Sequence, residues 1–150
     1  MIELEKVLSN ENLKKLSSLA SIIWIEHYSP ILGTTKASYM TSKFQSEEAI
    51  LKQIKDNNEY FIIKSSSKEI GYLAYKINGK NLFIDKIYLL KEFHGQSVGS
   101  FCMNFIEKLA EEKNCNSISL KVEQKNTNSI ATFKKWGFHI IDSLTRNIGN

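Results

Sequence analysis

The stretch that decides the fold is LFIDKIYLLKEFHGQSVGSFCMNFIEKL, residues 82–109. Apolar residues at strand spacing over 82–90 predict a strand, and the amphipathic run 97–113 predicts a helix. The loop between them carries Gly95 and Gly99, which let the backbone approach a ligand closely. A helix N-terminus presents unpaired N–H groups and the positive end of its dipole, so this unit predicts a pyrophosphate seat. A plain turn is the alternative, because two glycines between a strand and a helix are more often only a turn.

Upstream of this unit, the sequence changes from helical to β patterning. Apolar residues at helical spacing from Leu13 to Ile23 predict the first helix, and a proline pushes the residue before it out of the helical region. The expected elements are strand 2–6, a helix that Ser9 or Asn10 caps and that fades before Pro30, helical stretches beginning at 33–35 and at Ser46, and an antiparallel meander of strands 59–65, 70–77 and 82–90.

Downstream, strand and helix signals alternate. A strand over 117–122, a helix over 128–136 and a last strand over 138–142 complete the order β-α-α-β-β-β-α-β-α-β. Three hairpin strands followed by strand–helix units predict a mixed α/β sheet, antiparallel early and parallel late. The chain has 150 residues, which suits a single domain over 1–150 with one core.

Composition narrows the function classes. The chain is 42% hydrophobic and 24% charged with a net charge of +4, which is ordinary for a globular protein. Arg146 is the only arginine, which argues against nucleic-acid recognition. No stretch is long and apolar enough for a membrane span, and the start does not resemble a signal peptide. Cys102 and Cys115 make no disulfide scaffold, and the scattered histidines predict no metal site. A cytoplasmic protein is therefore expected.

A second motif lies about thirty residues after the loop. In KVEQKNTNSIATFKKWGFHIID (121–142), Asn126, Ser129, Phe133 and Gly137-Phe138 follow the spacing N-x-x-S-x-x-x-F-x-x-x-G-F. Together with the loop His94-x-x-Ser97-x-Gly99, this resembles the GNAT superfamily of N-acetyltransferases, and within it the bacterial polyamine-acetyltransferase-like members. The resemblance covers about residues 57–142, and it implies a GNAT fold whose central sheet splays into an acetyl-CoA cleft.

The resemblance also implies where the acetyl donor binds. The strand end at Ile87, Tyr88 and Leu89 would splay at a bulge and pair with the pantetheine arm, and an N–H near Leu89 would polarise the thioester carbonyl. Asn126 would contact the pantetheine amides, and Phe133 would lie beside the sulfur. The other implied donor contacts are the pyrophosphate loop His94, Gly95, Gln96, Ser97, Val98, Gly99 and Ser100, with Ser129 and with Lys134 or Lys135 near the ribose phosphate.

Three positions depart from the family pattern. Ser97 stands where glycine is usual, which is tolerated if its φ stays negative. His94 replaces glutamine or arginine. Phe133 stands where the family commonly has the tyrosine that protonates the departing thiolate. General acid help is typically worth about 10²–10⁴-fold, and a thiol with a pKa of about 8.5 leaves tolerably without it. Tyr28 or a water is then a substitute acid.

The acceptor amine must lose its proton, because alkyl ammonium groups have a pKa near 10. Asp85, inside the central strand, is the candidate base, and a structural carboxylate paired with a lysine is the equal alternative. The N-terminal helices form the substrate wall in the family. There Glu26 would attract a cationic amine, His27 lies beside it, and Trp24 would line the site or belong to the core.

The resulting hypothesis is an enzyme that transfers acetyl from acetyl-CoA to a primary amine of a small molecule. A polyamine is favoured as acceptor only by family likeness. The alternatives are a non-catalytic CoA-binding or regulatory module, which Phe133 motivates, and an interaction domain with an empty groove. No nucleic-acid, membrane or metal partner is expected, and a homodimer is left open.

Overall fold

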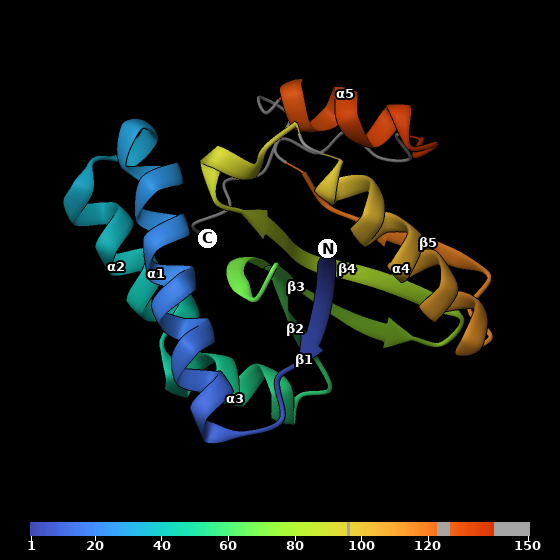
Figure 1. Cartoon of the computed structure of the whole chain (residues 1–150), viewed down its shortest axis with the longest axis horizontal. Helices are drawn as coiled ribbons and strands as arrows, with labels where there is room; N and C mark the ends of the chain where they lie inside the picture. The colour runs from blue at the N-terminus through green and yellow to red at the C-terminus, as the bar shows by residue number, and fades with distance from the viewer. Residues whose placement is uncertain (96, 123–126, 140–150) are drawn as a thin grey trace.

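The computed structural model describes residues 1–95, 97–122 and 127–139. A central sheet separates the N-terminal helices from the long helix that follows the meander (Figure 1). In chain order the elements are β1 (Ile2–Lys6), α1 (Asn10–Leu32), α2 (Thr34–Gln45), α3 (Glu47–Lys55), β2 (Glu59–Ser65), β3 (Lys68–Asn78), β4 (Asn81–Leu89), the 3-10 turn η1 (Lys91–Phe93), α4 (Val98–Glu112), β5 (Ser117–Leu120) and α5 (Thr127–Lys135).

The first helix is longer than its sequence predicts. The Ser9 hydroxyl accepts a hydrogen bond from the Asn12 amide at 3.1 Å and caps α1 as expected. The helix does not fade before Pro30, however, but includes it and ends at Leu32. Pro30 lies in the last turn, so it removes one backbone hydrogen bond without breaking a long ladder. Gly33, at φ 84°, then ends the helix.

Three helices, not two, separate the first two strands, so the predicted element order was wrong at this point. Ser46 caps α3 by accepting a hydrogen bond from the Ala49 amide at 3.2 Å. Glu47 and Glu48 occupy its first turn, where acidic side chains favour the positive end of the helix dipole. The signal at Ser46 therefore begins a separate helix. Among the described residues, no helix combines the length and the apolar composition that crossing a membrane requires.

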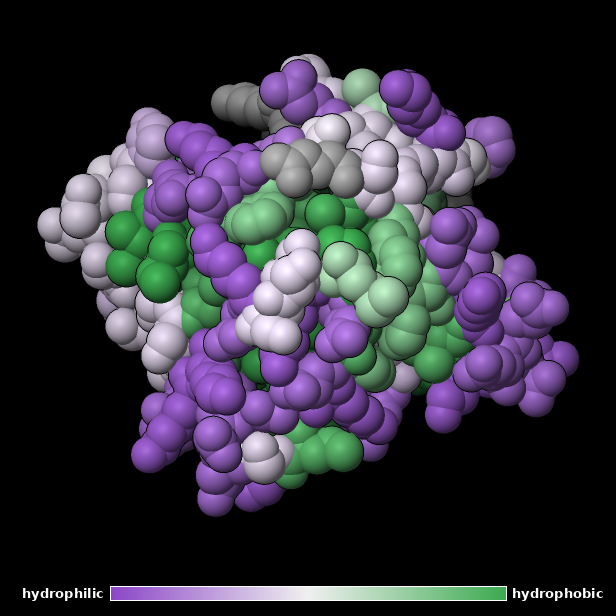
Figure 2. Space-filling model, in the orientation of Figure 1, coloured by the Kyte–Doolittle hydropathy of each residue, from purple (hydrophilic) through white to green (hydrophobic). Residues whose placement is uncertain are grey.

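The sheet confirms the predicted mixed α/β fold. Its order is β1-β2-β3-β4-β5, with β1 to β4 antiparallel and β5 parallel to β4. Alternate residues on β2 and β3 point to opposite faces and feed two cores. One core lies under α1 to α3 and includes Tyr60, Ile62 and Tyr72, and the other lies under α4 and includes Phe61 and Leu73. In Figure 2, apolar side chains lie in the centre of the view with hydrophilic side chains around them.

A β-bulge in β4 changes which residues of the strand point to each face of the sheet. Ala74 pairs with Lys86 and Tyr75 with Ile84, so Asp85 is the extra residue. Before it, Leu82 and Ile84 face the α4 core; after it, Ile87 and Leu89 do. Lys86, Tyr88 and Leu90 consequently face α1 to α3. The predicted bulge exists, but it lies before the strand end where it was expected.

The last predicted strand, 138–142, extends beyond the described residues. Helix α5 lies beside the N-terminal end of α4 in Figure 1. The chain after α5 turns through Gly137, whose φ is 97°, and the Phe138 amide donates to the Phe133 carbonyl at 3.0 Å. This turn brings Trp136 and Phe138 against the α4 core.

Candidate functional site

Among the described residues, the end of β4 pairs on one side only, and its other side is called the free edge. Its recorded pairing with β5 runs from Asn81 to Ile84 and stops at the bulge, while pairing with β3 continues to Leu89. The Leu90 amide donates to the Ile70 carbonyl at 2.8 Å. Hydrogen-bonded and non-hydrogen-bonded pairs alternate along an antiparallel ladder, so the amides and carbonyls of Ile87 and Leu89 point away from β3. They face the side on which β5 lies, beyond the last recorded pair of Ile84 with Leu120.

The three strand-end residues predicted to bind the acetyl donor therefore differ in where their backbone N–H and C=O groups point. Ile87 and the amide of Leu89 present groups on the free edge, as expected for pairing with an extended ligand, whereas the Leu89 carbonyl lies 3.1 Å from His94 Nε2. By the same alternation, the backbone of Tyr88 pairs with Tyr72 on β3. The side chain of Tyr88 instead turns toward α1, where its hydroxyl lies 3.5 Å from that of Tyr28.

The predicted pyrophosphate loop joins this strand end to α4. His94 is exposed, and its Nε2 lies 3.1 Å from the carbonyl oxygen of Leu89. Gly95 and Ser97 both have left-handed backbones, at φ 77° and 65°. The φ of Ser97 is therefore positive, so the condition for tolerating a serine here is not met. The left-handed conformation costs an L-residue about 1–2 kcal/mol. Gln96, between them, lies outside the described residues.

The first turn of α4 divides into an exposed and a packed side. Ser97 and Ser100 are exposed, and Val98 is buried in the α4 core. Gly99 packs against Trp136, the residue that follows α5: a Cβ on Gly99 would lie 2.8 Å from the Trp136 ring. The packing of Trp136 therefore explains why residue 99 has no side chain. A valine at this position would clash with the Trp136 ring whether or not a ligand is bound. Exposed amides at a helix N-terminus suit an anion.

The second motif is only partly described. Asn126 lies outside the described residues, and Ser129 is half-buried on α5. The Phe133 ring packs edge-to-face against Trp136 at 5.7 Å and Phe138 at 5.8 Å between centroids. Lys134 and Lys135 are exposed in the last turn of α5.

On the acceptor side, the structure places Trp24 in the core. Its side chain is 6% exposed, and its Nε1 donates to the Tyr72 hydroxyl at 2.6 Å. Trp24 is therefore not available to line a substrate site, and the core alternative holds. The hydroxyl of Tyr72 donates in turn to Gln45 Oε1 at 2.6 Å. Burial raises the pKa of Tyr72 well above its usual value, so it remains a protonated donor.

His27 and Tyr28 do reach the end of β4. The His27 ring is exposed, 4.7 Å from the Tyr28 ring and 6.5 Å from the Tyr88 ring. Partial burial lowers the pKa of His27, and the nearby His94 and Lys91 lower it further. Glu26 is also exposed, but it lies two residues from both Trp24 and Tyr28, roughly 200° round the helix. Glu26 therefore faces away from this group.

Asp85 is held by a lysine. Lys86 Nζ donates to Asp85 Oδ2 at 2.6 Å and to Gln53 Oε1 at 3.1 Å. Tyr60 also donates to Gln53 Oε1, at 2.5 Å, and accepts a long hydrogen bond of 3.4 Å from Gln45. A continuous hydrogen-bonded chain thus links Trp24 on α1 to the bulge. The structural alternative for Asp85 has direct support, since its carboxylate balances a lysine whose side chain is only 11% exposed.

The ammonium of Lys86 is stabilised in its charged form. Burial alone would lower its pKa, but the nearby Tyr60 and Asp85 outweigh this, and the net pKa lies above the usual 10.5. The resulting stabilisation is fully present below pH 10.5 and is lost as the pH rises through the folded-state pKa. Sequence reasoning missed Lys86, Gln45 and Gln53, and the only available signal was a lysine next to the bulge residue.

We expect Asp85→Asn to lower the free energy of unfolding by about 1–2 kcal/mol, because it leaves the buried ammonium of Lys86 without its counter-charge. The same change in a Lys86→Met background should cost much less, as urea unfolding of the four proteins would show. If Asp85 is also the base, kcat/KM for the amine falls in both backgrounds. Equal losses of stability in the two backgrounds would contradict the pairing.

A separate surface pocket of about 360 Å³ lies between α4, the start of β5 and the turn after α5. Its walls include Glu107, Glu111, Cys115, Trp136 and Phe138, and none of the predicted donor or acceptor residues. The pocket is therefore distinct from the strand-end site. In the described ranges, no three histidine, cysteine, aspartate or glutamate side chains gather as metal ligands.

A mixed sheet whose fourth strand has an edge without a described partner beside a helix N-terminus is suited to hold an extended ligand with an anionic end. The chain belongs to the acetyltransferase (GNAT) family, whose family model matches residues 17–138. The resemblance seen in the sequence is thereby confirmed. Members of this family use acetyl-CoA as the acyl donor.

Two solved structures show the shared fold. The N-acetyltransferase PaiA of Thermoplasma acidophilum, in complex with coenzyme A, superposes with a TM-score of 0.85 at 23% identity, covering 96% of this chain and 93% of that one. The aminoglycoside enzyme AAC(6')-Iy, bound to a CoA bisubstrate analogue, superposes with a TM-score of 0.68 at 14% identity, covering 98% and 97%. At these identities the likeness concerns the fold alone.

Curated relatives match over a shorter segment. The thialysine N-epsilon-acetyltransferase of Bos taurus is 28% identical over 73 residues, which is 45% of this chain and 43% of the relative. The Sus scrofa enzyme of the same name is 29% identical over 73 residues, with the same shares. The match thus spans less than half the length of these relatives.

Proposed function

We propose that this chain is a single-domain N-acetyltransferase that moves acetyl from acetyl-CoA to a primary amine of a small molecule. The observation that carries the proposal is the free edge of β4. The free edge at Ile87 and Leu89 leads to the N-terminus of α4. An extended thioester could therefore pair with the strand edge while its anionic end lies at the helix N-terminus. Two free cysteines and the use of acetyl-CoA fit a cytoplasmic enzyme.

In the proposed reaction, the amine nitrogen forms a bond to the acetyl carbon as the carbon–sulfur bond breaks. The Leu89 amide on the free edge would donate to the thioester oxygen as negative charge develops there. Holding both reactants in place would accelerate the reaction strongly, since effective molarities of well-oriented groups reach roughly 10⁵–10⁸ M. The amine gives up one proton and the departing thiolate takes one. Tyr28, whose hydroxyl lies near that of Tyr88, is the proposed donor to the thiolate.

The second candidate is a non-catalytic CoA-binding module, which the lack of a hydroxyl at Phe133 favours. Calorimetric titration with acetyl-CoA tests for binding, and release of free thiol over a panel of amines tests for turnover. Tight binding with no thiol release on any amine would support the module. An absence of binding would leave an interaction domain with an empty groove.

Ser97→Asp tests the donor site directly. Aspartate tolerates a left-handed backbone and stabilises a helix N-terminus, so we expect the protein to stay as stable as the wild type. The added charge would repel a pyrophosphate, and the affinity for acetyl-CoA should fall about tenfold or more. Asn104→Asp, an exposed position along the same helix, is the matched control and should bind normally. Equal affinities of the two variants would rule out this loop as the pyrophosphate seat.

A further inference from the structure

Five residues define the acceptor mouth: His27 and Tyr28 of α1, Tyr88 of β4, and Lys91 and His94 after β4. Tyr28, Tyr88 and His27 are linked by the contact of 3.5 Å between the tyrosine hydroxyls and by the ring separation of 6.5 Å between His27 and Tyr88. Lys91 begins η1, three residues before His94. His94 reaches the Leu89 carbonyl at 3.1 Å, so the mouth adjoins the free edge of β4. The inference below concerns this mouth and rests on the proposed acetyl transfer.

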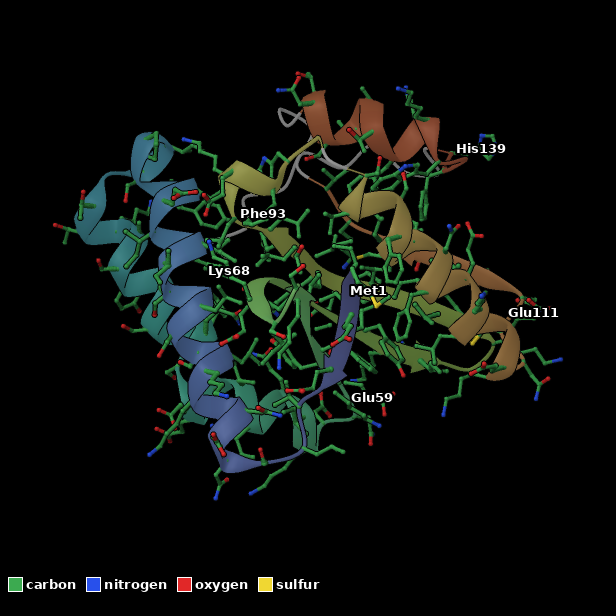
Figure 3. All side chains as sticks on the ribbon, in the orientation of Figure 1. Met1, Glu59, Lys68, Phe93, Glu111 and His139 are labelled. Atoms are coloured by element: carbon green, nitrogen blue, oxygen red, sulfur yellow. The ribbon has the colours of Figure 1, made fainter. Side chains whose placement is uncertain are left out.

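Two of the described carboxylates at this end of the sheet are matched by lysines. Asp85 is bound to Lys86 at 2.6 Å, and Glu92 lies 3.6 Å from Lys68, whose ammonium also covers the Phe93 ring (Figure 3). These pairs leave little negative charge to receive an incoming cation.

Two further carboxylates are placed differently. Glu69 stands opposite Lys64 in the β2–β3 register. Glu26 lies on the side of α1 that faces away from Tyr28, as its helical spacing shows. Glu26, which sequence reasoning proposed for attracting a cationic amine, therefore does not reach this site, and no other carboxylate of the described residues is recorded there.

Basic groups, by contrast, gather at the mouth. Lys91 and His94 are exposed on the loop that leaves β4. Both act on His27 across the mouth, where they lower its pKa in addition to the larger effect of burial. The lowered pKa keeps His27 uncharged at neutral pH, so the fixed positive charge at the mouth is that of Lys91. An acceptor entering here meets a positive field.

We infer that the acceptor is a primary amine whose far end carries an anionic group, and that Lys91 is a residue that selects it. A polyamine brings a second ammonium into the same positive field and is disfavoured. The name of the bovine and porcine relatives, which specifies the ε-nitrogen of an amino-acid analogue, is compatible with such an acceptor.

Three acceptors of equal chain length test the charge alone: 5-aminopentanoate, 1-aminopentane and 1,5-diaminopentane. Each presents the same primary amine, and the far ends are negative, neutral and positive. At saturating acetyl-CoA we expect kcat/KM for 5-aminopentanoate to exceed that for 1,5-diaminopentane by about tenfold, after correction for the two amines of the diamine.

Lys91→Glu should reduce this ratio by about fivefold or more, because it reverses one charge at the mouth. The ratio between two acceptors cancels any effect of the change on the donor. Lys80→Glu is the matched control: it makes the same change in the exposed turn before β4, about nine residues of strand away. It should leave the ratio within about twofold.

Two results would overturn the inference while leaving acetyl transfer intact. One is a wild type that prefers 1,5-diaminopentane, and the other is a Lys91→Glu variant whose ratio matches that of Lys80→Glu. A wild type that acetylates none of the three acceptors and no other amine would instead overturn the proposed function, and the inference with it.

Discussion

Gly71→Ala is expected to lower the free energy of unfolding by about 3 kcal/mol or more, because a buried backbone has no room to yield. A Cβ on Gly71 would lie 2.2 Å from the Tyr88 carbonyl oxygen and 3.0 Å from the Leu89 Cα. Gly71 faces Leu89 in a non-hydrogen-bonded pair, where the two strands approach most closely. Urea unfolding of the purified variant measures the loss.

Gly99→Ala provides the contrast. The new methyl group would also lie within 2.8 Å of a neighbour, but that neighbour is the outer edge of the Trp136 ring, a side chain that can shift. We expect a loss of about 1 kcal/mol, clearly smaller than for Gly71→Ala. If Gly71→Ala folds at all, its displaced Leu89 should also weaken acetyl-CoA binding. Equal and small losses for the two variants would contradict the close approach of β3 and β4.

Phe133→Tyr is the second large effect, and it concerns rate. Because Phe133 packs its ring against Trp136 and Phe138, tyrosine should keep the same ring position and add one hydroxyl. If that hydroxyl reaches the departing sulfur, turnover rises by up to about 100-fold where thiolate departure limits the rate. Affinity for acetyl-CoA should hardly change, since the new group acts in the transition state. Thiol release by wild type and variant is the measurement.

Phe83→Tyr is the control, since it adds the same hydroxyl near the start of β4 and should not alter turnover. A wild type and a Phe133→Tyr variant that are both silent on every amine would favour the CoA-binding module. A fast wild type that Phe133→Tyr slows would mean that another group already protonates the thiolate. Tyr28 is the first residue to test in that case.

The sequence predicted the meander, the strand–loop–helix unit and the family well, because each depends on local periodicity and on motif spacing. It located the bulge too late, although the apolar residues already change from even positions, Leu82 and Ile84, to odd positions, Ile87 and Leu89. Glu26 could also have been placed correctly, since its helical spacing from Trp24 and Tyr28 puts it on another face.

Other features could not be predicted from local pattern. The core was already one of the two alternatives for Trp24, but its hydrogen bond from Nε1 to the Tyr72 hydroxyl was not predicted. The close approach of Gly71 to Tyr88 and Leu89 was not predicted either. Each of these contacts joins residues from different elements, so only the folded arrangement reveals them. The left-handed backbone of Ser97 is similar, because serine gives no local sign that it will adopt a conformation typical of glycine.

The bulge at Asp85 has a consequence for how this strand can change over time. Because Asp85 is extra to the pairing, a strand without it would still pair Ile84 with Tyr75 and Lys86 with Ala74, and Ile87 and Leu89 would still face α4. In evolution, residue 85 is therefore a position at which the length of β4 can change without exchanging the two sides of the strand.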